Sequence, residues 1–97
     1  MIKEFDGDLK VFEESCIVDI WAPWCSPCKV TGKNLEDFSK EHPEITIYKV
    51  DAEQHPDVAE RFEVMSLPTI LCLEKEEVVW KHVGLITSKQ LKEKLGL

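Results

Sequence analysis

Residues 16–21, Cys-Ile-Val-Asp-Ile-Trp, constrain the fold more than any other part of this sequence. The run is apolar at successive positions, and its only charged residue is Asp19. Because successive side chains of a strand point to opposite faces of a sheet, a strand of this kind is buried on both faces. We therefore predict a central strand that is covered on both sides.

Strand and helix patterns alternate along the rest of the chain. Period-two and continuous apolar runs predict strands, and apolar positions at spacings of three and four predict helices. The further strands are expected at residues 2–5, 45–50, 69–74 and 78–83. The helices are expected at residues 8–14, from the Cys25–Cys28 segment to about residue 42, from Pro56 onward, and at 87–96. This order predicts an α/β fold with helices on both faces of a mixed sheet. The 97 residues are too few for a second domain, so we expect one domain, residues 1–97.

Charge and composition exclude several classes of partner. Twelve Lys and Arg residues against nineteen Asp and Glu residues give a net charge of −7, which repels phosphate backbones. No apolar run approaches the roughly 18 residues of a membrane helix, and the N-terminus lacks the basic and apolar regions of a secretory signal. We therefore expect a cytoplasmic monomer with no nucleic-acid or membrane partner.

Two of the four cysteines form the motif Cys25-Ser26-Pro27-Cys28 at the start of the long helix. A thiolate is the nucleophile of disulfide exchange, and the unpaired N–H groups and dipole of a helix N-terminus stabilise such an anion at Cys25. Cys28 lies one turn later on the same face, where it can attack a mixed disulfide at high effective concentration. The spacing therefore predicts that Cys25 attacks and Cys28 resolves.

Other interpretations of the cysteines have less support in the sequence. A zinc site would need two further ligands, and neither the other two cysteines nor the three histidines have knuckle spacing, so no metal is expected. Cys16 and Cys72 fall in predicted strands, where we expect small, buried and inert thiols. No glycine-rich phosphate loop is present, so no organic cofactor is expected.

The surrounding residues resemble the thioredoxin family over nearly the whole chain. Residues 21–29, Trp-Ala-Pro-Trp-Cys-Ser-Pro-Cys-Lys, are similar to the family's active-site segment, with Asp19 at the position of its buried acid. Residues 66–69, Ser-Leu-Pro-Thr, resemble its cis-proline loop, Lys49 lies on the matching strand end, and Gly84 matches the glycine after the final strand. The resemblance implies a thioredoxin-like fold with five strands flanked by four helices.

The resemblance also implies an activity. It implies a dithiol that reduces protein disulfides and is recharged by an electron donor of the thioredoxin-reductase type. Asp19 would exchange a proton with Cys28, because burial in an apolar strand raises the pKa of a carboxyl, with Lys49 opposing that rise. A cis Pro68 would place the backbone of Leu67 beside the sulfur atoms, where a substrate peptide can add as a strand.

The remaining residues of the motif have lesser expected roles. Trp24 is expected to flank the site with apolar surface, Trp21 to be mainly structural, and Ser26 and Pro27 to meet the substrate. Ser26 replaces the family's usual glycine, and the identity of this dipeptide influences redox potential. An oxidase, an isomerase, and a thioredoxin-like binding module without redox turnover therefore stay open. All catalytic versions require Cys25 to be open to solvent.

Overall fold

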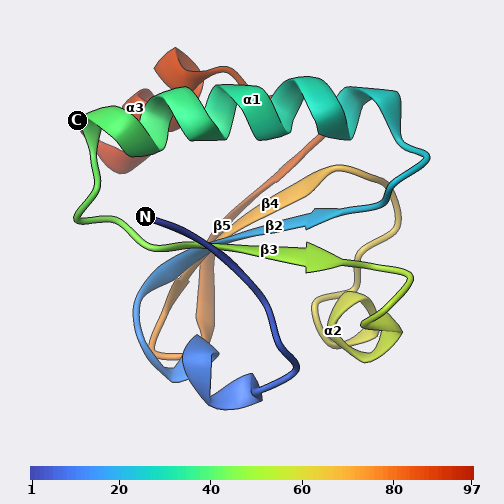
Figure 1. The fold of residues 1–97 in the computed structure, drawn as a ribbon. Coiled ribbons are helices and arrows are strands. Elements are labelled where there is room, and N and C mark those ends of the chain that lie inside the picture. The colour runs from blue at the N-terminus through green and yellow to red at the C-terminus, as the bar shows by residue number, and fades with distance from the viewer.

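The computed structural model describes residues 1–97 as a five-stranded mixed sheet with helices on both faces (Figure 1). The elements in chain order are β1 (Ile2–Glu4), the 3-10 helix η1 (Leu9–Glu13), β2 (Cys16–Trp21), α1 (Ser26–Glu41), β3 (Ile47–Asp51), α2 (Pro56–Arg61), β4 (Thr69–Glu74), β5 (Glu77–Val83) and α3 (Ser88–Leu95). Across the sheet the order is β1-β3-β2-β4-β5. The strands β1, β3 and β2 run parallel, whereas β4 and β5 pair antiparallel.

The predicted central strand is confirmed. β2 lies between β3 and β4, and all its residues except Trp21 are buried. Its side chains alternate between two separate cores: Val18 joins the cluster on one face, and Ile17 joins the cluster on the other. Burying both faces of one strand in this way fixes its register, because a slip by one residue would exchange the two sets of side chains.

Two helical layers cover these cores. Figure 1 shows α1 and α3 together on one face of the sheet, and α2 with the blue helical turn η1 on the other. Leu35 and Phe38 of α1 pack with Leu91 of α3 in the core that contains Ile17. Phe12 of η1 packs with Val58 of α2 in the core that contains Val18. Each fully buried side chain of this size contributes about 1.5–3 kcal/mol to the free energy of unfolding.

The expectation of four helices is wrong in one detail, because three are α-helices and the first is a 3-10 helix. The Asp8 side chain accepts a hydrogen bond from the N–H of Lys10, and the chain is extended again at Glu14. Only five residues remain between these limits, enough for the tighter i→i+3 bond that Val11 donates to Asp8, at 3.3 Å. None of the helices has the length and apolar character needed to cross a bilayer.

Two loops meet beside the N-terminal end of α1. The Leu67–Pro68 peptide bond is cis, as the resemblance to the family implied. The N–H of Gly84, after β5, donates a hydrogen bond to the carbonyl of Pro68 at 2.8 Å. Gly84 has a φ of +97°, a conformation that L residues with a side chain rarely adopt. The glycine therefore lets the chain turn where it joins the cis-proline loop.

Replacing two glycines by alanine should shift stability in opposite directions. Gly84→Ala should lower the free energy of unfolding by about 1–2 kcal/mol, because alanine is strained at positive φ. Gly32→Ala, inside α1, should raise it by about 0.5–1 kcal/mol through helix propensity. The new Cβ at residue 32 would meet only the flexible end of Lys49, at 3.4 Å. Urea unfolding measures both, and a Gly84→Ala variant as stable as the wild type would contradict this account of the Gly84 turn.

Candidate active site

Cys25 and Cys28 form a disulfide at the N-terminal end of α1, with their Cα atoms 5.2 Å apart. Cys25 is the N-cap residue, and its Sγ accepts a hydrogen bond from the backbone N–H of Cys28 at 3.3 Å. Ser26 and Pro27 begin the helix, where a proline has no helical N–H bond to lose. The free N–H groups of this first turn therefore stabilise negative charge on the Cys25 sulfur.

The two cysteines are less exposed than the sequence led us to expect. Cys25 keeps 5% of its surface exposed and Cys28 keeps 3%, so the expectation of an open Cys25 is wrong in degree. The cause is tertiary packing, because Ala22, Trp21 and Leu67 pack around the pair. Cys25 meets solvent only over this small exposed area, which we call the window.

The motif residues on either side of Cys25 in the sequence are exposed. Trp24 is 69% exposed, and Ser26 and Pro27 are exposed on the first turn of α1. The structure thus brings the predicted substrate-contacting residues of the motif to the surface next to the buried Cys25 in the chain. An exposed indole beside a narrow opening gives a docking partner apolar area to cover.

The cis-proline loop lies against the same cysteines. Leu67 packs on the cluster that contains Cys25 and Cys28, and the Thr69 hydroxyl donates to the carbonyl of Ser66 at 2.6 Å. Gly84 joins this loop through its bond to Pro68. Leu67, Pro68 and Gly84, far from the motif in sequence, are therefore gathered at the end of the sheet where α1 begins.

Asp19 is completely buried on β2, and neither of its carboxylate oxygens has a hydrogen-bond partner. Loss of hydration raises its pKa from 3.8 to about 7, a rise that the Lys49 charge opposes and the Glu4 charge reinforces. Strand register explains these neighbours, because Lys49 pairs with Asp19 across β3 and Glu4 pairs with Lys49 across β1. The carboxyl can therefore gain and lose a proton near neutral pH.

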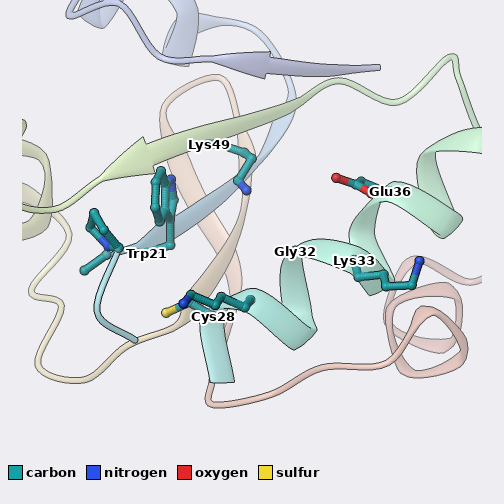
Figure 2. Close-up of a pocket in the computed structure, with 9 residues that line it drawn as sticks. Trp21, Cys28, Gly32, Lys33, Glu36 and Lys49 are labelled. Atoms are coloured by element: carbon teal, nitrogen blue, oxygen red, sulfur yellow. The ribbon is translucent and has the colours of Figure 1, made fainter. Parts of the chain in front are cut away.

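A pocket of about 260 Å³ opens beside Cys28, between β3 and the first turns of α1. Figure 2 shows Lys49 reaching from its strand toward α1, between Trp21 and Gly32. The Lys49 ammonium lies 4.9 Å from the centroid of the Trp21 ring, a cation–π contact. The pocket gives protons and small molecules a path from solvent to the side of Cys28.

The sequence reasoning missed three residues that line this pocket, which are Gly32, Lys33 and Glu36. Their signal was present, because Gly32 and Glu36 follow Cys28 at four-residue intervals and so share its side of the helix. The reasoning had used this spacing only for apolar residues. The pocket also places Lys49 at the site, where the sequence analysis had expected Lys49 only to oppose the rise in the pKa of Asp19.

The other two cysteines stay apart from this site. Cys16 pairs with Leu73 and Cys72 with Ile17, so the two thiols lie on opposite faces of the sheet, and both are free. Burial raises the pKa of Cys16 to about 11 and also raises that of Cys72, which makes both thiols poor nucleophiles. Cys72 is only half-buried, which corrects the expectation that both are buried. No group of three or more potential metal-ligating side chains is found.

Comparison with known proteins agrees with this geometry, since the family model described as Thioredoxin matches residues 2–96. The chain belongs to the thioredoxin family. The thioredoxin of Buchnera aphidicola subsp. Baizongia pistaciae is 33% identical over 97 residues, which cover 95% of this chain and 89% of that one. The thioredoxin of Staphylococcus epidermidis is 35% identical over 95 residues, covering 97% and 91%. Mitochondrial thioredoxin of Mus musculus is 40% identical over 80 residues, 81% of this chain and 48% of its own length.

Solved thioredoxin structures share the fold. Thioredoxin NaTrxh from Nicotiana alata superimposes with a TM-score of 0.86 at 26% identity, over 97% of this chain and 89% of that one. Chloroplastic thioredoxin z gives 0.84 at 26% identity, over 98% and 91%. As a family member with a redox-active cysteine pair, this protein is a thiol-disulfide oxidoreductase. Thioredoxins act on protein disulfides and receive electrons from a reductase.

The buried acid predicts a specific pH dependence of stability. The folded state binds the Asp19 proton up to about pH 7, whereas the unfolded state loses it near 3.8, so the free energy of unfolding falls as pH rises through this window. Asp19→Asn cannot ionise, and its stability relative to the wild type should therefore increase by about 4 kcal/mol between pH 3 and pH 8.

Urea unfolding of the disulfide form at several pH values measures this difference, in which the other titrating groups cancel. Asp37→Asn, an exposed substitution on α1, is the matched control and should show no such trend. A stability difference for Asp19→Asn that stays constant from pH 3 to pH 8 would show that the carboxyl does not have a raised pKa.

Proposed function

We propose that this protein reduces disulfide bonds in other proteins, with Cys25 as the attacking residue and Cys28 as the resolving residue. The observation that carries this proposal is the Cys25 sulfur at the N-cap of α1, hydrogen-bonded to the N–H of Cys28. In the dithiol form that environment favours a thiolate on Cys25, the species that attacks disulfides.

The exchange proceeds in two balanced steps. The Cys25 thiolate attacks one sulfur of the substrate disulfide, forming a mixed disulfide and releasing the second substrate sulfur as a thiolate. The Cys28 thiolate then attacks the Cys25 sulfur, which closes the Cys25–Cys28 bond and releases the first substrate sulfur. Two electrons pass to the substrate, and the protein ends in the disulfide form that the structure describes.

Asp19 is the base that we assign to the second step. Cys28 must lose its proton before it attacks, and a carboxyl with a pKa near 7 accepts that proton at neutral pH. Lys49 supports the assignment, because its charge stabilises the carboxylate form. The pocket beside Cys28 lets the proton pass on to solvent.

The substrate is expected to dock on the exposed residues next to Cys25. A peptide in extended conformation adds alongside Leu67 and Pro68 through main-chain hydrogen bonds, and it covers Trp24 and the Ser26-Pro27 turn. The contact of Leu67 with the cysteines and the exposure of Trp24 support this arrangement. The hydrogen bond from Gly84 to the Pro68 carbonyl holds the loop in place.

The wider setting follows from the same proposal. We infer that residues 1–97 work as one domain and as a monomer, in the cytoplasm, and that a reductase of the thioredoxin-reductase type returns the pair to the dithiol form. Relatives in the thioredoxin family support such a donor. The net charge of −7 argues against nucleic acid as a partner.

Two cysteine variants should separate the two steps. With dithiothreitol as electron source, Cys25→Ser should abolish reduction of insulin disulfides. Cys28→Ser should instead accumulate a mixed disulfide with the substrate, because no internal thiolate resolves it. Mass spectrometry under non-reducing conditions detects this adduct.

Cys72→Ser is the matched control, because it removes a half-buried thiol outside the site, and it should keep wild-type activity. Insulin reduction that persists in Cys25→Ser would rule out the assigned roles.

The narrow exposure of Cys25 favours one alternative, a thioredoxin-like binding module without turnover. Such a module would bind its partner equally well in Cys25→Ser and Cys28→Ser, and the wild type would not reduce insulin. The reductase role instead requires wild-type turnover that depends on both cysteines.

The direction of electron flow is tested separately. We expect the pair to be more reducing than the glutathione couple, so that equilibration with glutathione leaves it mainly as the disulfide. A redox titration followed by alkylation and mass measurement gives the ratio. A pair that glutathione readily reduces would act as an oxidase or isomerase.

A further inference from the structure

Two side chains of α1 hold the backbone of Ile86, the residue two positions after Gly84. The Thr31 hydroxyl oxygen accepts a hydrogen bond from the N–H of Ile86 at 3.3 Å, and the Asn34 side-chain amide donates to the Ile86 carbonyl at 3.0 Å. Thr31 and Ile86 are both completely buried. The N–H of Ile86 therefore has no water to replace the hydroxyl, and both polar groups of this peptide segment are satisfied by one helix.

Helix propensity does not explain why Thr31 and Asn34 occur in α1. Threonine and asparagine form α-helices less readily than alanine or leucine, yet both occur inside α1. What these two polar groups add is the pair of hydrogen bonds to Ile86, which lies 55 and 52 residues further along the chain. Nearby, the ring Nε2 of His82 lies 3.0 Å from the Leu85 carbonyl, so the segment 84–86 is held at successive residues.

These contacts belong to a chain of contacts that starts and ends on α1. From α1 they lead to Ile86, along the chain to Gly84, and through the 2.8 Å hydrogen bond from Gly84 to Pro68. Leu67, the neighbour of Pro68, packs on Cys25 and Cys28 at the start of the same helix. The helix that carries Cys28 therefore also sets where the back of the cis-proline loop can lie.

We propose that Thr31 and Asn34 are positioning residues for protein substrates. By fixing Ile86 they hold Gly84 and Pro68 at the spacing that lets a substrate strand reach the sulfur of Cys25. This inference rests on the proposed function, because it assigns the docking of the same reaction. The narrow window above Cys25 gives the spacing its importance, since a small shift of the Leu67–Pro68 loop changes access to the sulfur.

The inference predicts a split between large and small substrates. Thr31→Val removes the acceptor of a buried N–H, and Asn34→Ala removes the donor to its carbonyl, so each frees the 84–86 segment. KM for insulin should rise by about fivefold in each variant, which corresponds to about 1 kcal/mol, while kcat changes little. The reaction rate with 2-hydroxyethyl disulfide should stay within about twofold of wild type, because so small a molecule makes no strand contact with the loop.

Three further measurements sharpen the test. Thr31→Ser keeps the hydroxyl and should restore the wild-type KM. Ser39→Ala, also on α1, removes a hydroxyl for which the structure shows no hydrogen bond, and it serves as the matched control. Hydrogen exchange of the Gly84 amide should speed up in Thr31→Val and Asn34→Ala but not in Ser39→Ala, since that amide is bonded to Pro68.

The outcomes distinguish the inference from the function on which it rests. A wild type that reduces neither substrate overturns the proposed function. A wild type active on both, with Thr31→Val and Asn34→Ala showing unchanged KM for insulin, overturns the positioning role alone. Equal loss on insulin and on 2-hydroxyethyl disulfide also overturns it, because it would mean general damage to the site. If Thr31→Val does not fold, Asn34→Ala decides, because the Asn34 side chain is only half-buried and its removal disturbs the core less.

Discussion

Burial of β2 on both faces is the constraint from which the rest of the site follows. A strand covered on both sides must end where the two layers end, and the chain leaves β2 at Trp21 only four residues before the Cys25 N-cap. The same burial encloses Asp19 without a hydrogen-bond partner. The strand β2 therefore carries the buried Asp19 and also leads directly to the N-terminal end of α1, where the cysteine pair lies.

Much of this arrangement could be predicted from the sequence, because the signals were local. The apolar run of β2 and the Cys25–Cys28 spacing each lie within a few residues, and the structure contains both. What escaped prediction depends on pairs far apart in the chain. The family resemblance placed Leu67 beside the sulfur atoms, but it did not indicate how far this packing buries Cys25. The hydrogen bond from Ile86 to Thr31 also joins distant residues, and no periodicity within one segment indicates it.

Asp19 shows why the site is a compromise with stability. A carboxylate enclosed by apolar strands without hydrogen bonds is costly, and evidently the protein tolerates it because Lys49 offsets part of the charge. Lys49 is itself held near the pocket by the Trp21 ring, and the missing side chain at Gly32 leaves room for its ammonium. The apolar clusters on the two faces of the sheet supply the stability that this buried charge subtracts.

Two electrostatic effects then act on the cysteine pair in opposite directions. The N–H groups at the start of α1 stabilise a thiolate, which favours the reduced form and makes the pair more oxidising. Ionised Asp19 repels a thiolate on Cys28, which disfavours the reduced form and makes the pair more reducing. Because about 1.4 kcal/mol corresponds to about 30 mV, a modest change in either effect moves the direction of exchange. A change in the protonation of Asp19 near neutral pH would therefore couple the reducing power of the pair to pH, through the same buried carboxyl to which we assign the proton of the resolving step.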